Sequence, residues 1–331
     1  MQNQQTNTSF QGAQPLVSFI IAYYNLPVQM LCECIDSILA LSLQPSEREI
    51  IIVDDGSKVS PMNGLMRYGD AIIYIRQKNQ GLSCARNKGI DMATGKYLQF
   101  VDADDKLITA SYNYCIQLLR EHEDADMVMF DFTNDETQQQ MFSLLYTTNG
   151  TELMRHHNIH GTAWGYIFRK NNLSELRFTP GIYHEDEEFT PLLLIRAELL
   201  LVTDAKAYYY NKRRYSITTS TDKEKTQKRL NDCHSVIVRL HNKADRLPVN
   251  ERLAIQRRVA QLTMDYLYQV IMQTRSSQEL NQRIEQLRSQ GLFPLPRRNY
   301  SQKYVWFRVM TITSFGRTIL LNTLPLISKE R

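Results

Sequence analysis

Aspartates stand where three apolar segments of the sequence end: EIIIVDD (49–55), YLQFVDADD (97–105) and DMVMFDF (126–132). Aspartate is a poor strand former, although a single one is readily explained as a helix cap or a turn residue. The two clusters at 54–55 and 102–105 are harder to explain in that way. Gathered carboxylates are ligands that Mg²⁺ and Mn²⁺ prefer, together with phosphate oxygens. These clusters therefore favour a metal-using site.

The spacing within the second cluster indicates how it would hold a cation. In an extended segment Asp102 and Asp104 point to the same side and Ala103 points to the other. Two carboxylates on one side can share one ion, and we predict that these two do. Asp105 would face away from them if the strand continued.

Predicted strands alternate with predicted helices through the first half of the chain. Short apolar runs rich in β-branched residues are typical of buried strands, and apolar residues at helical spacing are typical of helices. Asn25 can cap the first helix. The alternation predicts an α/β fold with a mostly parallel sheet covered by helices on both faces, and ligands of such sheets bind beyond the carboxyl ends of the strands. The predicted strands are 16–21, 49–55, 71–75, 97–105 and 126–132, and two of the helices are 82–93 and 108–123.

The glycine-rich phosphate loops of many nucleotide-binding folds are missing from the sequence. No two of the 13 glycines stand two residues apart, so the Rossmann fingerprint does not occur, and there is no Walker A motif. The phosphates of a bound nucleotide would therefore need another source of positive charge. A divalent cation held by aspartates is the obvious one.

Four blocks of the sequence stand out: VSFIIAYYN (17–25), EIIIVDDGS (49–57), NQGLSCARNKGIDMATGKYLQFVDADD (79–105) and HEDEEF (184–189). Together they resemble the blocks of family 2 glycosyltransferases, which have the GT-A fold. The resemblance covers about residues 16–220, with the blocks in the right order. It implies an enzyme that takes a sugar from a nucleotide-diphospho-sugar, commonly a UDP-sugar. The first block departs from the usual pattern, because Ala22 and Tyr23 stand where proline and a small residue are common.

The resemblance implies donor-binding roles for residues of the first three blocks. Tyr24 and Asn25 match the positions that hold the nucleotide base. Asp54 matches an aspartate that usually contacts the base, commonly uracil, and Asp55 stands beside it. Arg86, in the A-R-N of the third block, matches an arginine near the base and the phosphates.

The same resemblance places the reacting groups. Asp102 and Asp104 match the D-x-D motif, in which the first aspartate holds the ribose side and the second holds Mn²⁺ or Mg²⁺ on the diphosphate. A metal that stabilises the leaving nucleotide replaces the acid, so one carboxylate suffices as the base for the acceptor. The resemblance assigns that base to Asp186, with Glu185 orienting the acceptor or capping the helix. The alternative for this acidic run is a solvated helix N-terminus, where Asp and Glu are favoured.

Charge divides the chain into an acidic and a basic part. Residues 201–331 hold 24 Lys and Arg against 10 Asp and Glu, a net of +14, whereas residues 1–200 hold 15 against 25, a net of −10. The basic part either binds an anionic partner or consists of solvated basic helices. It contains no nucleic-acid recognition motif, so we do not expect nucleic acid as a partner.

The last forty residues hold seven Lys and Arg against one Glu, mixed with aromatic and aliphatic residues such as Trp306 and Phe315. This mixture suits either an amphipathic segment on an anionic membrane surface or a helix docked on the protein's own core. The expected organisation is a disordered tail (1–14), a GT-A catalytic domain (15–220), a region of helices at 223–247, 250–275 and 277–290 (221–291) and a basic amphipathic tail (292–331).

The N-terminus, the apolar runs and the cysteines of the sequence indicate where the protein is located. The polar N-terminus is unlike a secretory signal, no apolar run reaches the ~18 residues that span a bilayer, and five irregularly spaced cysteines form no disulfide framework. We therefore expect a cytoplasmic protein that can lie on the inner face of the cell membrane. The resemblance suggests a saccharide or lipid-linked acceptor in the assembly of cell-envelope polysaccharide.

Three function classes stay open. The first is an inverting, metal-dependent hexosyltransferase. The second is a sugar nucleotidyltransferase, which has a related sheet but needs a glycine-rich loop after the first strand, where AYYNLPVQM has no glycine. The third is a non-catalytic module that binds nucleotide-sugars. The presence of both the D-x-D motif and the E-D pair argues against this third class.

Overall fold

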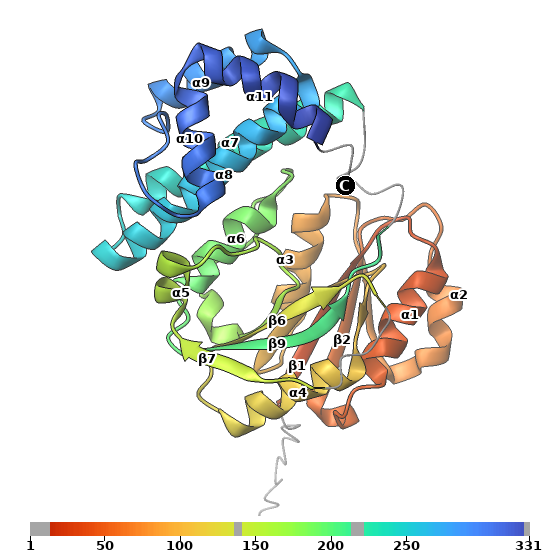
Figure 1. The fold of residues 1–331 in the computed structure, drawn as a ribbon. Coiled ribbons are helices and arrows are strands. Elements are labelled where there is room, and N and C mark those ends of the chain that lie inside the picture. The colour runs from red at the N-terminus through yellow and green to blue at the C-terminus, as the bar shows by residue number, and fades with distance from the viewer. Residues whose placement is uncertain (1–13, 136–140, 213–221, 328–331) are drawn as a thin grey trace, which may run out of the picture. The chain divides into compact units, whose positions relative to one another are not determined.

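The computed structural model describes residues 14–135, 141–212 and 222–327. The predicted disordered tail, except Gln14, lies outside these residues, as does the predicted domain boundary at 220. The chain forms two compact units, which we call the sheet unit and the helical unit (Figure 1). The sheet unit is Met1–Leu145, Trp164–Ser174 and Thr203–Asn211, and the helical unit is Tyr146–Ala163, Glu175–Val202 and Lys212–Arg331.

The centre of the sheet unit is a parallel ladder around strand β1 (Val17–Tyr23). Strand β1 pairs in parallel with β2 (Arg48–Asp54) on one side and with β4 (Tyr97–Asp102) on the other, and β3 (Ile73–Arg76) continues the ladder beyond β2. The inner strands are almost wholly buried, as expected for near-continuous apolar runs in a parallel sheet. The predicted mostly parallel α/β sheet is confirmed.

Beyond β4 the sheet becomes antiparallel. Strand β8 pairs antiparallel with β4, β6 with β8, and β5 with β9. The order across the sheet is β3-β2-β1-β4-β8-β6-β9-β5, with β7 paired to β9. The additional strands are β5 (Lys106–Leu107), β6 (Met127–Thr133), β7 (Leu144–Thr148), β8 (Tyr166–Arg169) and β9 (Leu200–Tyr209).

Helices of the sheet unit agree with the predicted ones to within a few residues. Their bounds are α1 (Val28–Leu39), α2 (Met62–Leu65), α3 (Leu82–Met92) and α4 (Thr109–Glu121), with 3-10 turns η1 (Pro45–Glu47), η2 (Met66–Ala71) and η3 (Lys170–Leu173). The expectation that Asn25 caps the first helix is wrong. Helix α1 begins with Pro27 at its N-cap position, and the Asn25 side chain accepts a hydrogen bond from Lys58 N instead.

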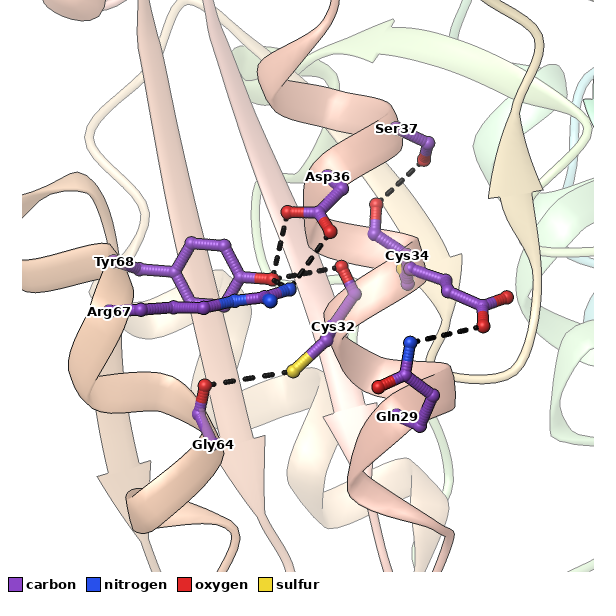
Figure 2. A network of polar contacts seen from close by, with 9 residues as sticks. Gln29, Cys32, Cys34, Asp36, Ser37, Gly64, Arg67 and Tyr68 are labelled. Carbon is purple, nitrogen blue, oxygen red and sulfur yellow. Dashed lines mark hydrogen bonds and ion pairs between the residues drawn. The ribbon is translucent and has the colours of Figure 1, made fainter.

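A surface network fastens η2 to the outer side of α1 (Figure 2). Arg67 Nη2 donates to Asp36 Oδ2 at 2.9 Å, and the Tyr68 hydroxyl lies 2.9 Å from Asp36 Oδ1 and 3.0 Å from the Cys32 carbonyl oxygen. The Arg67 and Asp36 side chains are about half exposed. Exposed pairs of this kind contribute little stability, so the network holds a loop in place and is not a candidate site.

The helical unit contains the predicted C-terminal helices. Its longest members, α7 and α8, pack together over buried residues that include Val236, Leu240 and Leu267. The N-caps of α7, α9 and α10 are Asp222, Ser276 and Ser301, whose side chains accept backbone N–H groups as such caps do. The helices are α5 (Gly150–His156), α6 (Glu185–Leu194), α7 (Lys223–Ala244), α8 (Val249–Thr274), α9 (Ser277–Ser289), α10 (Gln302–Ile312) and α11 (Ser314–Ile327).

The last two helices use one face for packing and leave another exposed. Helices α10 and α11 lie against α8, with Tyr304, Phe307 and Leu320 buried. Trp306 is 48% exposed and Phe315 is 75% exposed. In the described part of the chain, no helix has the length and apolar character needed to cross a membrane.

Candidate active site

The parallel ladder brings the predicted strand-end acids of the sheet unit together. In its register Tyr23 of β1 is paired with Asp54 of β2, and Ala22 of β1 is paired with Asp102 of β4. The last residues of β2 and β4 therefore flank the carboxyl end of β1. This edge is where open α/β sheets bind ligands.

Asp54 is fully buried, and its carboxylate is used to shape the loop after β2. It accepts hydrogen bonds from Ser57 N and from the Tyr74 hydroxyl, both at 2.8 Å, and Arg76 Nε lies 3.7 Å away. These donors compensate the loss of hydration that burial of a carboxylate entails. Asp54 thus fixes the D-D-G-S turn in this structure.

Asn25 fastens the loop after β1 to the same turn. Its backbone N–H donates to Ser57 Oγ at 2.9 Å, and its side-chain oxygen accepts from Lys58 N at 2.8 Å. Asn25 has a positive φ of 51°, which asparagine tolerates better than most residues. The neighbouring Tyr24 is 47% exposed. Of the two residues predicted to hold the nucleotide base, Asn25 is thus held by hydrogen bonds to the turn after β2, and Tyr24 faces solvent.

Asp55 links the turn after β2 to the start of α3. Its carboxylate accepts from Gln77 Nε2 at 2.8 Å, from Gln80 N at 2.9 Å and from Gly81 N at 2.8 Å. Gly56, with φ +77°, has no space for a side chain, because a Cβ there would lie 2.7 Å from Asn79 N. Asp55 therefore sets where α3 begins.

Helix α3 presents Arg86 to the end of β4. Arg86 Nη2 donates to Asp102 Oδ1 at 2.9 Å, and the guanidinium carbon lies 5.9 Å from the centre of the Phe100 ring. Arg86 is buried, whereas the Asp102 side chain is 31% exposed. A fixed positive charge thus lies beside a partly exposed carboxylate, as a diphosphate site would need.

The expectation that residues 102–104 form an extended segment is wrong. Strand β4 ends at Asp102, and Asp105 N donates to the Asp102 carbonyl oxygen at 3.0 Å, which closes a four-residue turn. Ala103 and Asp105 are buried, whereas Asp102 and Asp104 are partly exposed. The carboxylates of Asp102 and Asp104 are therefore partly exposed because of this turn, and not because side chains alternate along a strand.

Tyr208 and Asn211, which sequence reasoning did not assign to the site, hold this turn from beneath. The Tyr208 hydroxyl donates to Asp105 Oδ2 at 2.9 Å and accepts from Asp102 N at 3.0 Å. Asn211 N donates to Asp105 Oδ1 at 2.8 Å. Burial, together with the nearby charge of Asp102, raises the pKa of the Asp105 carboxyl. The Tyr208 ring stacks on Trp164 with 4.3 Å between ring centres.

The residue types at this turn suit a divalent cation that also binds phosphate. Asp102 and Asp104 supply hard oxygen ligands of the kind that Mg²⁺ and Mn²⁺ prefer. Among the residues that the structure describes, no group of three or more His, Cys, Asp or Glu side chains could hold a metal. A cation here would therefore take its remaining ligands from water or from phosphate oxygens.

Glu185 and Asp186 lie in the helical unit, in the first turn of α6. His184 occupies the N-cap position with a positive φ of 63°, and desolvation by burial lowers its pKa. Glu185 is buried, and Asp186 is partly exposed with Oδ1 accepting from Glu187 N at 2.9 Å. The two neighbours thus have different surroundings, as their ~100° separation on a helix requires.

The two remaining acids of this turn are ion-paired. Glu187 pairs with Arg258, and Glu188 pairs with Arg239 through two contacts of 2.7 and 2.8 Å. A solvated helix N-terminus would expose these side chains freely. The acidic run is instead built into the packing of the helical unit.

Comparison with known proteins shows which family the chain resembles. Residues 18–177 match the sequence profile described as Glycosyl transferase family 2. Over these residues the chain is similar to this family. The uncharacterized glycosyltransferase EpsJ of Bacillus subtilis (strain 168) is 31% identical to it over 223 residues, which cover 62% of this chain and 63% of EpsJ. The match thus spans less than two thirds of that relative.

Solved structures of two glycosyltransferases share the fold of this chain. TarS of S. aureus (residues 1–349), in complex with UDP-GlcNAc, superposes with a TM-score of 0.64 at 17% identity, covering 93% of this chain and 88% of that one. The mannosyltransferase PcManGT of Pyrobaculum calidifontis, in complex with GDP-Man and Mn²⁺, has a TM-score of 0.55 at 13% identity and covers 96% of this chain and 88% of that one. These similarities show a GT-A-like fold.

Replacing Tyr208 with Phe tests whether its hydroxyl supports the D-A-D-D turn at residues 102–105. The change leaves Asp102 N–H and one oxygen of buried Asp105 without their partner, so we expect the free energy of unfolding to fall by about 1–3 kcal/mol. Denaturant titration measures this. Tyr209→Phe, on the opposite face of the same strand, is the control and should stay within about 0.5 kcal/mol of wild type. Equal effects of the two changes would contradict the assigned support.

Proposed function

We propose that this protein is a family 2 glycosyltransferase with an inverting mechanism, which moves a sugar from a nucleotide-diphospho-sugar, a UDP-sugar, to a hydroxyl of a saccharide or lipid-linked acceptor. The observation that carries the proposal is the strand-end cluster, in which the parallel ladder places Asp54 and Asp102 beside β1, with Arg86 paired to Asp102. The nucleotide-sugars in the solved structures of TarS and PcManGT support this donor class.

The loops after β1 and β2 form the proposed base-binding region. Tyr24 offers an exposed ring, and Asn25 holds the two loops together through Ser57 and Lys58. Asp54 and Asp55 face the region with buried carboxylates that are already hydrogen-bonded inside the protein. Base contact by either aspartate therefore requires the base to share or replace one of these donors.

The D-A-D turn and Arg86 form the proposed diphosphate region. Arg86 offers a fixed guanidinium, and Asp102 and Asp104 would hold Mn²⁺ or Mg²⁺. Such an ion, when bound, supplies Lewis-acid stabilisation of the charge on the leaving nucleoside diphosphate. Tyr208 holds the turn that carries the two partly exposed carboxylates through its contacts with Asp105 Oδ2 and Asp102 N.

Asp186 is the proposed general base. The acceptor oxygen attacks the anomeric carbon from the side opposite to the leaving group, and the bond from that carbon to the diphosphate oxygen breaks. The electron pair of that bond leaves with the nucleoside diphosphate, and the acceptor proton moves to the Asp186 carboxylate. A single displacement of this kind inverts the anomeric centre. Partial exposure of Asp186 supports the role, whereas buried Glu185 suits a supporting one.

The exposed side of α10 and the start of α11 is the proposed contact with an anionic membrane surface. Trp306, Val309, Ile312 and Phe315 are each about half exposed or more. At ~100° per residue, the three on α10 occupy an arc opposite to buried Phe307. Residues 292–327 hold five Lys and Arg and no acidic residue. Aromatic residues with basic neighbours match what anionic bilayers bind, and a position at the membrane would suit a lipid-linked acceptor.

Replacing Asp104 with Asn should strongly weaken Mn²⁺-dependent nucleotide binding, because it removes a charged ligand and keeps the shape of the side chain. Asp102→Asn should weaken it less. Calorimetry with UDP, with and without Mn²⁺, measures the effect, and Asp70→Asn on the exposed surface is the control. Unchanged nucleotide affinity in Asp104→Asn, together with full activity in chelator, would overturn the metal assignment.

Replacing Asp186 with Asn should leave nucleotide binding intact and lower kcat by on the order of 10²-fold or more, as expected for loss of a general base. The matched change Glu185→Gln should affect kcat less and acceptor KM more, because it removes ground-state contacts. Steady-state kinetics of both variants on a panel of nucleotide-sugars, with donor affinity measured separately, tests this. Normal turnover by Asp186→Asn would show that the base is another group.

Vesicle binding tests the membrane contact through fluorescence. The chain has two tryptophans, and Trp164 is buried, so a blue shift on adding phosphatidylglycerol vesicles would report on Trp306. We expect binding at low salt that is lost in the double variant Trp306→Ser/Phe315→Ser and kept in Met66→Ser, which changes an exposed methionine of the sheet unit. If wild type fails to bind, or if these residues instead mediate self-association in sedimentation, the membrane proposal is wrong.

A further inference from the structure

The first turn of α6 is held by arginines of the C-terminal helices. Its four consecutive acids, Glu185–Glu188, interact well with the helix dipole but repel one another. Glu187 is paired with Arg258 of α8, and Glu188 with Arg239 of α7. Within the helical unit, the C-terminal helices therefore decide how this acidic turn is arranged.

Arg258 is the more deeply buried of the two arginines. Its side chain is 6% exposed, its Nη2 is paired with Glu187 Oε2, and its Nη1 donates to the Ile159 carbonyl oxygen at 2.9 Å. Gly161 lies against this pair, and a Cβ there would overlap the Glu187 carboxylate. Buried ion pairs contribute little net stability, because desolvation offsets their attraction. A role in fixing geometry is thus a better explanation for this pair than a role in stability.

Glu187 connects Arg258 to the proposed base. The Glu187 backbone N–H donates to Asp186 Oδ1 at 2.9 Å. Arg258 holds the Glu187 side chain, so it also fixes the peptide group that holds the Asp186 carboxylate. Asp186 itself needs no contact with the arginine for this connection to operate.

The segments on either side of Asp186 are held in the same way. Arg239 makes two contacts with Glu188, whose carboxylate also accepts from Thr179 Oγ1 at 2.8 Å. Before the helix, Asp232 Oδ2 accepts from Tyr183 N at 2.9 Å, and Lys228 Nζ donates to the Gly181 carbonyl oxygen at 2.9 Å. Asp186 is thus a partly exposed acid in a turn that residues of α7 and α8 fix on both sides.

We propose that Arg258 is a positioning residue for the reaction, acting through Glu187 to orient the Asp186 carboxylate toward the acceptor hydroxyl. This inference rests on the proposed role of Asp186 as the base. It gives the helices after residue 222 a part in catalysis that needs no contact between them and the substrate.

The test compares Arg258→Met with Arg283→Met. Arg283 is an equally buried arginine of the helical unit, 7% exposed, and its partner Glu279 is 28% exposed against 26% for Glu187. Both changes should lower the melting temperature by similar amounts. Only Arg258→Met should lower kcat, by on the order of 10-fold to 10²-fold, because misplacement of a reacting group costs rate. Donor KM and UDP affinity by calorimetry should stay at wild-type values in both.

Two further variants separate positioning from general loss of structure. Arg258→Lys keeps the charge but lacks the guanidinium fork, so it should restore part of the lost kcat. Gly161→Ala keeps every charge and displaces the Glu187 carboxylate, so it should lower kcat without changing donor KM. A kcat loss that merely follows the melting temperature across Arg258→Met, Arg283→Met and Gly161→Ala would overturn the inference.

The Asp186→Asn variant, measured in the same assay, separates failure of this inference from failure of the proposed base. If Asp186→Asn is nearly inactive and Arg258→Met turns over normally, the base stands and the positioning role is wrong. If Asp186→Asn itself turns over normally, the base assignment is wrong, and the positioning role is wrong with it.

Discussion

Parallel pairing of β1 with β2 and β4 is the interaction on which the sheet unit depends. In this register β1 lies between β2 and β4 with both of its faces buried, as central strands of a parallel sheet do. The register that buries the core also sets Asp54 beside Tyr23 and Asp102 beside Ala22. The position of the strand-end acids is thus a consequence of core packing, and the chemistry at this edge depends on residues that lie far from it.

Most of the acids at this edge support the structure and are not free ligands. Asp54, Asp55 and Asp105 are buried, and each accepts at least two hydrogen bonds of 2.8–2.9 Å from loops or side chains of other elements. A buried carboxylate without such donors would be costly. Each one therefore ties its own loop to a second segment. The partly exposed carboxylates of Asp102 and Asp104 therefore belong to a turn whose backbone is held in place by buried hydrogen bonds.

Local sequence patterns predicted the strands and helices well, because continuous apolar runs and helical spacing reflect burial that each segment carries within itself. These patterns failed where a residue far away in the sequence determines the local conformation. Residues 102–105 were expected to continue the strand, but Asp105 finds Tyr208 and Asn211 more than 100 residues away, and the chain turns to reach them. Asn25 was expected to cap α1 but bonds to Lys58. The family resemblance indicated which residues matter, and the structure added how they are held.

The basic excess of the C-terminal part divides into two kinds of charge. Arg239, Arg258 and Arg283 are paired with glutamates inside the helical unit, so their charges are already compensated and offer little to an external anion. Arg297, Arg298 and Lys303 are exposed and lie in a stretch without acidic residues, next to exposed Trp306. Net charge alone therefore overstates the attraction of this region for polyanions. Among the described residues, the last helices and their preceding loop carry exposed basic side chains with no acidic residue in the same stretch, and the exposed apolar side chains there fit the proposed lipid surface better than a nucleic acid.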